Sequence, residues 1–418
     1  MSEISDMIQQ LCPDGVEYRK LGEIGFFYAG LSGKCKDDFK DGNAMFINYL
    51  NVYSNPSLNL NVQEKVRIYN GEKQNIIQKG DILFTGSSET PDECGMSSVV
   101  MEQPCENAYL NSFCFGLRLF NPERFDMIYL KHLLRSTEIR KMISGTASGV
   151  TRFNVSKKRF SMVSIPVPPI EVQRKIGEVL DNFSELTAEL TAELTARQKQ
   201  YEYYRDNLLN FNRGGQVASD VKWMKMSEVF EIRNGYTPSK AKPEFWESGI
   251  IPWFRMEDIR QNGRILSDSI LHITSEGVKG KGLFKANSFI LATTATIGEH
   301  ALIIADSLAN QQFTNLKICK SLENELTIKY VFHYLFVVDE WCKANTNVSG
   351  FASVDMAKFK NLLFPIPPLA EQERIVSILD RFEALTTDLT SGLPAEIKAR
   401  QQQYEYYRDQ LLTFKRAN

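Results

Sequence analysis

The chain has 418 residues, of which 43% are hydrophobic, so it is too long for one ordinary core and we expect two to four domains. Its formal net charge of -2 argues against a protein that coats nucleic acid by electrostatic attraction alone. The first 17 residues contain no apolar run typical of a signal peptide, and nowhere do 18 apolar residues follow one another. We therefore expect a soluble, cytoplasmic protein.

The two halves of the chain begin and end alike. GVEYRKLGEI (15–24) matches DVKWMKMSEV (220–229), and IPVPPIEVQRKIGEVLDNF (165–183) matches FPIPPLAEQERIVSILDRF (364–382). RQKQYEYYRDNLLNF (197–211) returns as RQQQYEYYRDQLLTF (400–414), with twelve of fifteen positions identical. Between these segments, residues 25–164 and 230–363 share almost nothing except an SG step, Ser148-Gly149 and Ser349-Gly350. A duplication with similar ends and different interiors indicates one common attachment and two different targets.

The two interior segments predict mixed helix and strand. Short β-like runs separated by turn-rich loops are AMFINYLNVY (44–53), GDILFTG (80–86), SFCFGLRLF (112–120), SFILATTATIG (288–298) and TNLKICK (314–320). A helix-like segment follows late in each interior, at 126–144 and 326–345. Neither interior has an alternating β-α-β pattern with a Gly-rich first turn.

Each half ends in a predicted long helix that starts after a Pro-Pro pair. Apolar residues recur at steps of four and three, which predicts a coiled-coil seam about five heptads long. The predicted core residues are Ile176, Leu180, Phe183, Leu190, Leu194, Leu208, Ile375, Leu379, Phe382, Leu389 and Leu411. Tyr201, Tyr204, Phe211, Tyr404, Tyr407 and Phe414 fit the same seam. A four-residue stutter at Ser391-Gly392-Leu393-Pro394 predicts that the second helix breaks and restarts there, with Ser391 as a candidate cap.

A helix with such a seam needs a partner helix. We favour pairing of the two copies within one chain, because two globular segments joined by two long helices form a pseudo-symmetric body. Pairing between chains in a homo-oligomer is the alternative. The predicted fold class is α+β, with two mixed α/β domains separated by an intramolecular antiparallel two-helix coiled coil and related by a pseudo-twofold axis.

Signatures of enzyme chemistry are missing from the sequence. There is no GxxxxGK[ST] loop and no Gly-rich strand-turn-helix for a dinucleotide or methyl donor, and GVKGKG (277–282) fits a turn. The seven cysteines form no CxxC pair and the four histidines lie far apart, so we predict no metal site. Glu89, Asp92 and Glu93 lie close together, but loops commonly cluster acids. We predict no catalytic residue and expect both halves to serve binding.

Polar and planar side chains crowd the loops of both interiors. Asn and Gln read adenine edges, Arg and Lys read guanine, and Ser and Thr hold phosphates. The candidates for DNA contact are Lys34, Lys36, Asn48, Asn51, Tyr53, Ser87, Ser88, Arg152, Asn154, Lys157, Lys158, Tyr236, Thr237, Ser239, Lys240, Trp253, Arg255, Thr293, Thr294, Gln311 and Gln312. From Lys131 to Arg159, eight basic residues accompany one acid, Glu138, which fits either a phosphate-facing strip or a solvated helix face.

Over essentially its full length, the chain resembles the specificity subunit of a type I restriction-modification system. The resemblance rests on the paired [IF]P[VI]PPxxxQ runs, on the YEYYRD[NQ]LL box that occurs twice, and on ELTAELTAELTA at 185–196. This tetrapeptide repeat, together with the box, is similar to the IC-like subgroup. GYTPSK…FW…IPW (235–253) and FINYLNVY with GDILFTGSSET (46–53, 80–90) resemble target-recognition segments of such proteins.

The resemblance implies a division of the chain into four parts. Residues 1–164 and 214–363 would be target-recognition domains 1 and 2, and residues 165–213 and 364–418 would be the two conserved coiled-coil helices. Each recognition domain would hold one half of a bipartite, asymmetric site in double-stranded DNA, with the paired helices as a ruler between them. The recognised bases depend on loop geometry and DNA shape and are not predicted.

The resemblance also implies partners. These are two methyltransferase (modification) subunits and the restriction/translocase subunits, with no membrane involved. We expect no cofactor in this chain, because S-adenosylmethionine, ATP and Mg belong to the partner subunits. Two identical methyltransferases need two equivalent docking faces, for which Tyr203, Arg205, Tyr406 and Arg408 are the candidates for outward contact.

Two other functions compete with this interpretation. The first is a non-catalytic coiled-coil scaffold whose globular domains bind proteins; salt-sensitive, sequence-selective DNA binding separates it from a specificity subunit. The second is a free-standing DNA methyltransferase or nuclease, which the missing cofactor loop disfavours.

Overall fold

A computed structural model describes residues 2–211, 220–280, 282–347, 352–387 and 392–417. The chain forms two compact units: unit 1 comprises Met1–Ala192 and Ala395–Asn418, and unit 2 comprises Glu193–Pro394. These units differ from the four predicted segments, because each unit combines one interior segment with helical residues from both halves of the sequence. Among the described residues, no helix has the length and apolar character needed to cross a membrane.

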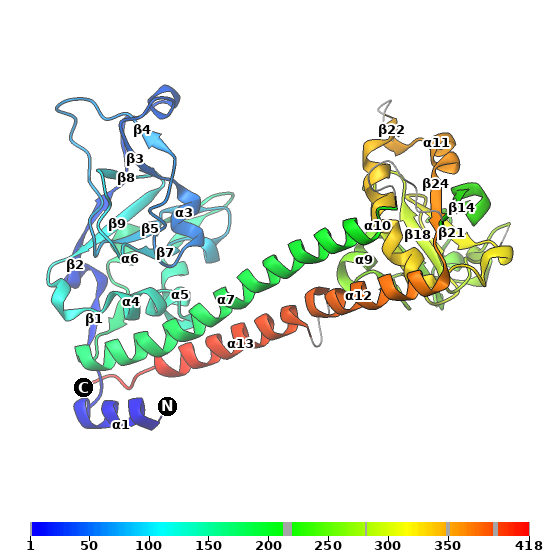
Figure 1. Cartoon of the computed structure of the whole chain (residues 1–418). Helices are drawn as coiled ribbons and strands as arrows, with labels where there is room; N and C mark the ends of the chain where they lie inside the picture. The colour runs from blue at the N-terminus through cyan, green and yellow to red at the C-terminus, as the bar shows by residue number, and fades with distance from the viewer. Residues whose placement is uncertain (1, 212–219, 281, 348–351, 388–391, 418) are drawn as a thin grey trace. The chain divides into compact units, whose positions relative to one another are not determined.

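Unit 1 is built on a four-stranded antiparallel sheet in the order β2-β9-β5-β7 (Figure 1). Its strands are β1 (Tyr18–Lys20), β2 (Gly25–Ala29), β3 (Ala44–Ile47), β4 (Lys65–Val66), β5 (Ile82–Thr85), β6 (Ser87–Ser88), β7 (Ser97–Val99), β8 (Ala108–Leu110), β9 (Cys114–Leu119), β10 (Ala147–Gly149), β11 (Phe153–Val155) and β12 (Ser164–Pro166). Its helices are α1 (Ser2–Leu11), α2 (Leu21–Ile24), α3 (Tyr49–Ser54), α4 (Met127–Leu133), α5 (Thr137–Ser144), α6 (Lys157–Phe160), the first part of α7 (Ile170–Leu208) and most of α13 (Leu393–Leu411). The buried rings of Phe84, Phe115 and Phe160 pack together in its core, with centroids 4.9 to 5.4 Å apart.

Two predicted elements of unit 1 differ from the structure. The strand predicted over residues 44–53 ends at Ile47, and α3 begins at Tyr49 because the Asn48 side chain accepts a hydrogen bond from the Asn51 amide and caps a helix. The single helix predicted over residues 126–144 is two helices, α4 and α5, with Ser136 at the N-cap position of the second.

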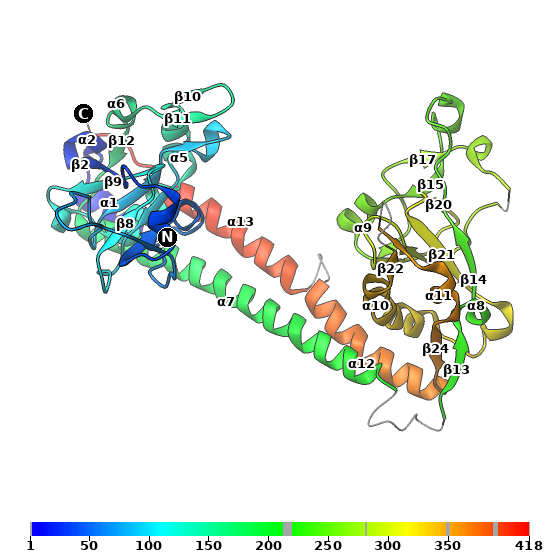
Figure 2. The same ribbon diagram turned by 90° about the horizontal axis from the view of Figure 1, so that it is seen from above.

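Unit 2 is built on a five-stranded sheet in the order β14-β21-β18-β19-β16 (Figure 2). Its strands are β13 (Lys222–Lys225), β14 (Phe230–Asn234), β15 (Ile251–Phe254), β16 (Ile265–Leu266), β17 (His272–Ile273), β18 (Ser288–Ala292), β19 (His300–Ile303), β20 (Leu308–Ala309), β21 (Phe313–Ile318), β22 (Thr346–Asn347), β23 (Ser353–Val354) and β24 (Leu363–Ile366). Its helices are α8 (Met226–Val229), α9 (Met256–Asn262), α10 (Ile328–Ala344), α11 (Met356–Asn361), α12 (Leu369–Thr387) and the last part of α7.

In unit 1, α7 packs antiparallel to α13 (Figure 1). The Phe183 ring stacks on Tyr407 with centroids 5.3 Å apart, and Ser184 on the next position of α7 lies beside Tyr404, one turn earlier in α13. Ile176 and Leu180 are fully buried and Leu411 is nearly so. Of the predicted core positions in this unit, 176, 180 and 411 are buried, and Phe183 and Leu190 are half-buried.

In unit 2, the end of α7 packs antiparallel to α12. The Tyr204 ring stacks on Phe382 at 5.3 Å, and Ile375 and Leu379 are fully buried. Leu194 and Leu208 are half-buried. The helices thus pair within the chain, as predicted; α12 ends at Thr387 and α13 begins at Leu393, with Gly392 outside both helices. Leu389 and the candidate cap Ser391 lie outside the described residues.

A buried glutamine fixes the same turn in both units. In unit 1 the Gln173 amide nitrogen donates to the carbonyls of Arg124 (3.0 Å) and Pro168 (2.8 Å), and its oxygen accepts from the Asp126 amide (2.9 Å). In unit 2, Gln372 repeats all three contacts, with Glu325 (2.7 Å), Pro367 (2.9 Å) and Thr327 (2.9 Å). The glutamine of the PPxxxQ run therefore joins the start of the long helix to the preceding domain through hydrogen bonds.

The helices α4 and α10, which precede the turn held by Gln173 and Gln372, also make matching contacts. This corrects the expectation that the two interior segments share almost nothing. The Tyr129 hydroxyl donates to the Pro166 carbonyl (3.1 Å), and the Tyr330 hydroxyl donates to the Pro365 carbonyl (3.0 Å). One turn further on, His132 binds Asp181 in unit 1 and His333 binds Asp380 in unit 2. The common framework thus includes α4 and α10, not only the segments that the sequence comparison aligns.

Candidate nucleic-acid interface

The SG step of the first half lies in a hairpin that joins two distant loops. Strands β10 and β11 form this hairpin, and β11 also pairs with β6, so that Asn154 lies opposite Ser87 and Phe153 opposite Ser88. At the hairpin tip, Val150 is 92% exposed. The fold therefore brings the predicted 87–88 and 152–158 segments together, although they are far apart in the sequence.

A hydrogen-bond network holds the base of this hairpin. The Tyr49 hydroxyl donates to the Ser87 carbonyl (2.8 Å), and Glu93 accepts from the hydroxyls of Ser88 (2.8 Å) and Tyr53 (3.0 Å). These bonds hold the pKa of the Glu93 carboxyl below its usual range, with Ser88 as the largest contributor. Ser88 and Tyr53 are thus held in place by an acid that the sequence did not identify as a partner.

Arg152 lies on the exposed side of the same surface. Its guanidinium stacks over the half-exposed Phe113 ring at 4.7 Å and lies 3.4 Å from the Ser87 hydroxyl. Asn154, Lys157 and Lys158 are exposed nearby in the sequence. A planar cation stacked on an aromatic ring suits contact with a base edge or a phosphate, so this patch is the best-formed candidate in unit 1.

Two arginines of the predicted basic strip point inward instead. Arg135 donates to the carbonyls of Ser97 (2.5 and 2.8 Å) and Tyr53 (3.0 Å), and burial lowers its pKa to about 10. Arg140 donates to the carbonyls of Gly95 (2.6 Å) and Cys94 (2.7 Å). The phosphate-facing strip is therefore wrong for these two residues, because their guanidinium groups hold the loop that carries Ser87 and Ser88.

Four other predicted residues of unit 1 have structural contacts. Lys34 is nearly buried, where it binds Glu72 (2.6 Å) and the Arg67 carbonyl (2.6 Å), and Asn51 is 7% exposed. Asn51 donates from its side chain to the Asn59 carbonyl at 2.8 Å, so the polar groups of Asn51 and Lys34 serve the fold of unit 1 and not DNA contact. Asn48 caps α3 and donates to Glu64 (2.6 Å). Ser87 is buried, and its hydroxyl contacts Arg152. Lys36 is exposed, and no contact places it beside the hairpin.

The candidates of unit 2 also gather on one surface. The hydroxyl of Thr237 binds the Gln311 side chain, and the Thr293 amide donates to the Gln312 carbonyl (2.9 Å). Thr294 forms a β-bridge with Ser353 of β23, the strand that follows the second SG step. Ser349 and Gly350 themselves lie outside the described residues. Gln311, Ser239 and Lys240 are exposed, whereas Tyr236 and Gln312 are half-buried.

Burial argues against direct contact by two predicted residues of unit 2. Trp253 is 2% exposed and its indole nitrogen donates to the Tyr236 carbonyl (3.0 Å), so it positions that loop. Thr293 is 6% exposed and its hydroxyl bonds to Thr314 (2.8 Å). Arg255 is half-buried like Tyr236 and Gln312; its backbone amide donates to Asp258 (2.7 Å) at the N-cap position of α9, and its guanidinium stays a candidate for contact. Sequence patterns alone did not separate such loop-shaping residues from contact residues.

The twin YEYYRD boxes present the same side chains in the same way. Tyr203 is 65% exposed and Tyr406 is 62% exposed, although each belongs to a different unit. The arginines two residues later are not outward: Arg205 lies over the rings of Tyr201 and Phe336, and Arg408 lies over the Tyr404 ring. The predicted outward position therefore suits the two tyrosines, whereas the arginines are mostly covered by their own units.

Comparison with known proteins bears on both halves of the chain. A family described as "Type I restriction modification DNA specificity domain" matches residues 13–197 and 218–399. The chain belongs to this family. The specificity subunit of the type I restriction enzyme EcoprrI from Escherichia coli is 55% identical over 203 residues, which cover 47% of this chain and 51% of that protein. The EcoR124I/EcoR124II specificity subunit from the same species is 40% identical over 271 residues, with 61% and 64% coverage.

The chain thus spans between half and two thirds of the length of these two relatives. A putative type I specificity subunit from Haemophilus influenzae is 31% identical over 70% of this chain and 73% of its own length. A solved structure titled for complex assembly and conformational transition of the type I R-M system matches with a TM-score of 0.66 and 18% identity, over 96% of this chain and 98% of that chain. The S subunit of a type I system from M. genitalium matches with a TM-score of 0.51 and 15% identity, over 95% and 96%. These structures support the α+β fold of this type I specificity protein.

Proposed function

We propose that the chain is the DNA sequence-specificity subunit of a type I restriction-modification complex of the IC-like subgroup and is not itself an enzyme. In this proposal, unit 1 reads one half and unit 2 the other half of a bipartite, asymmetric site in double-stranded DNA. The single observation that carries the proposal is that the specificity-domain family matches both halves of the chain, while the loops of the two halves differ.

The two candidate surfaces support different readouts for the two half-sites. The surface of unit 1 offers a stacked arginine, Arg152, with serine and asparagine side chains beside it. The surface of unit 2 offers Thr237 and Gln311 in hydrogen-bond contact. Arginine favours guanine, whereas glutamine and asparagine favour adenine, so two unlike surfaces on a common framework would produce an asymmetric site.

The equal exposure of Tyr203 and Tyr406 supports docking of two identical methyltransferase subunits. Exposed aromatic side chains are enriched at protein interfaces and commonly dominate binding energy. We infer that these partners supply S-adenosylmethionine and the transfer of a methyl group to adenine, and that restriction/translocase subunits supply ATP- and Mg-dependent chemistry. This chain would then need no cofactor of its own.

Reconstitution with the modification subunit tests the proposal. Genome-wide mapping of methylated adenines should give one motif with two specified parts and an unspecified spacer. Methylation without a bipartite motif, or salt-insensitive binding to proteins only, would instead favour a coiled-coil scaffold.

A deletion within the tetrapeptide repeat tests the ruler. Removing Thr191–Leu194 shortens α7 by about 6 Å and removes about 40° of rotation beyond a full turn, while one base pair advances about 3.4 Å. We expect a shorter spacer with both half-sites unchanged, as read from the methylation motif. An unchanged spacer contradicts the ruler but leaves the specificity function standing.

A further inference from the structure

Both units use the same histidine–aspartate contact to attach a domain helix to a long helix. In unit 1, the His132 ring nitrogen Nε2 lies 3.0 Å from Asp181 Oδ1, and Lys131 binds the same carboxylate. In unit 2, His333 Nε2 lies 2.9 Å from Asp380 Oδ1, and Lys329 binds Oδ2. The histidine–aspartate pair is thus a tether common to both units and does not by itself indicate a ligand.

Unit 2 differs from unit 1 beside this tether. In unit 1, a hydrogen bond of 2.8 Å joins His132 Nδ1 to the Tyr404 hydroxyl, which also interacts with Ser184. The matching residues of unit 2 are His333, Tyr201 and Glu383. Neither His333 Nδ1 nor the Tyr201 hydroxyl has a hydrogen-bond partner within the part of the chain that the structure describes, although the ring of His333 is fully buried and Tyr201 is 8% exposed.

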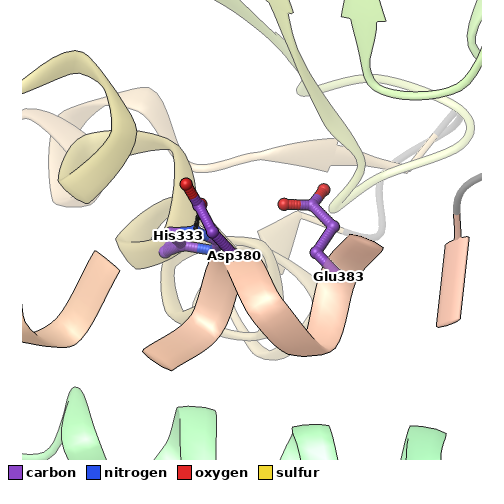
Figure 3. A group of neighbouring side chains, drawn as sticks. All are labelled: His333, Asp380 and Glu383. Atoms are coloured by element: carbon purple, nitrogen blue, oxygen red, sulfur yellow. Dashed lines mark hydrogen bonds and ion pairs between the residues drawn. The ribbon is translucent and has the colours of Figure 1, made fainter. Parts of the chain in front are cut away.

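Glu383 adds a third potential donor to the pair in unit 2. The ligand atoms of His333, Asp380 and Glu383 all lie within 4.8 Å of one another. Figure 3 shows the carboxylates of Asp380 and Glu383 on the same side of α12, with His333 beside Asp380 from α10. Glu383 is one α-helical turn after Asp380, so both carboxylates reach the imidazole without any change of backbone.

The cluster is accessible from solvent. Glu383 and Tyr201 line a cleft of about 1230 Å³ in unit 2, together with Arg264 and residues of the segment that follows α9. Burial raises the pKa of the Tyr201 phenol most, and the charges of Glu383 and Asp380 raise it further, which agrees with the shared cleft in placing Tyr201 near these two acids. A buried hydroxyl without a protein partner is a group that a bound ion or its water ligand would satisfy.

We propose that His333, Asp380 and Glu383 bind a first-row divalent transition-metal ion of the Zn²⁺ class. One imidazole nitrogen and two carboxylate oxygens are a donor set that zinc accepts with water in the remaining position. The imidazole selects against Mg²⁺ and Ca²⁺, which prefer oxygen ligands. The ion would link α10 to α12 in unit 2 and so reinforce the contact between His333 and Asp380.

The positive side chains nearby leave this coordination open. Lys329 binds Oδ2 of Asp380, whereas His333 faces Oδ1, and the Lys329 side chain is 66% exposed and free to turn outward. Arg264 lines the same cleft and its positive charge acts on Glu383, but its guanidinium already donates to the His300 carbonyl (2.8 Å) and lies over the Phe336 ring (4.9 Å). Metal binding through Nε2 requires the His333 proton to lie on Nδ1, which has no hydrogen-bond partner in the described part of the chain.

Cobalt provides a spectroscopic probe of this site. Titration of the purified full chain with Co²⁺ should produce visible d–d absorption that saturates at one equivalent and is displaced by Zn²⁺ but not by Mg²⁺. The free cysteines are a competing class of ligand, and Co²⁺ bound to thiolate shows an additional near-ultraviolet charge-transfer band. We expect the d–d bands without that band.

Glu383→Gln is the decisive variant, because Glu383 takes no part in the tether that both units share. It should weaken Co²⁺ binding at least about tenfold and abolish the rise in melting temperature that Zn²⁺ gives the wild-type chain. Glu202→Gln, which removes an exposed carboxylate that lines the same cleft, is the matched control and should bind as wild type does. Equal Co²⁺ affinity of wild type and Glu383→Gln, or absorption from thiolate ligation alone, overturns the proposal.

Discussion

Unit 1 and unit 2 agree in their buried polar contacts and differ in their exposed loops. Gln173 and Gln372 make three matching hydrogen bonds each, and the hydroxyls of Tyr129 and Tyr330 bind matching proline carbonyls. The surface around the β10–β11 hairpin of unit 1 and the surface around Thr237 and Gln311 of unit 2 contain different residue types. The two halves of the duplication therefore keep the contacts that attach each domain to its long helix, whereas the residues on the exposed face of each domain differ.

The largest effect is expected at the two exposed tyrosines. Because Tyr203 and Tyr406 are equally exposed, the double variant Tyr203→Ala/Tyr406→Ala should lose about 4 kcal/mol of methyltransferase binding, or about a thousandfold in affinity. Each single variant should lose about half of that energy and leave one methyltransferase bound. Native mass spectrometry of the assembled complex measures the number of bound subunits.

The exposed neighbour Glu202 provides a control for this experiment. Glu202→Ala in the same helical turn should leave assembly unchanged. Loss of both methyltransferases from a single tyrosine variant would show that the two docking faces are not equivalent, and the comparison of the units would fail at that point.

A smaller effect is expected from the two buried glutamines. Gln173→Ala and Gln372→Ala each leave one amide and two carbonyl groups without a buried partner, so each should destabilise its own unit by about 2–4 kcal/mol. Hydrogen exchange should show the loss locally, at the amides of Asp126 in one variant and Thr327 in the other. Destabilisation of only one unit would show that the repeated bonds differ in strength.

The framework could be predicted from the sequence only in part. The repeated segments at 15–24 and 165–183 form the paired strands β1 and β12, and their counterparts form β13 and β24 in the same register. Apolar spacing also predicted the helix seam and its break. The roles of Tyr129 and His132 were missed, because two side chains that match between the halves of an otherwise different helix produce no visible sequence pattern.

The contact surfaces were predictable by region but not by residue. The segments around Ser87, Arg152, Thr237 and Gln311 were all selected from composition, and the fold places them on two surfaces. Asn51 and Trp253 were selected by the same criterion but are buried, because a planar polar group serves a loop's own backbone as well as it serves a base. The cluster of His333 and Asp380 was missed since its members lie far apart in the sequence.

Arg152 should affect one half-site alone, by about 1–2 kcal/mol. Arg152→Ala removes the guanidinium stacked on Phe113, so sites altered in the half read by unit 1 should be discriminated less, with no change at the other half. Relative methylation rates of DNA substituted in either half measure this. Lys158→Ala is the control: the loss of an exposed lysine should weaken both cognate and altered sites alike and reduce the salt dependence. If Arg152→Ala discriminated less against altered bases in both half-sites, the two units would not read their half-sites separately.

The smallest effect is expected from pH at the tether of unit 1. Burial lowers the pKa of His132, although the hydrogen bond with Asp181 opposes this, and Lys131 and Arg408 add to the lowering. The unfolded histidine, with its pKa near 6.5, therefore takes up a proton at a higher pH than the folded one. Stability is fully present above that value and is lost as pH falls from about 6.5 toward the lower folded pKa.

Asp181 does not contribute in this pH window. Burial raises its pKa, but the hydrogen bonds from His132 and Lys131 outweigh burial and hold it below its usual range, so the carboxylate stays charged while the histidine titrates. His132→Gln keeps a polar side chain and removes the titration, so its urea midpoint should fall less than that of wild type between pH 7.5 and pH 5.5. If the urea midpoints of wild type and His132→Gln fell equally with pH, the Tyr404 contact would be keeping the pKa of His132 near its ordinary value. The tether of unit 1 would then not depend on a neutral imidazole.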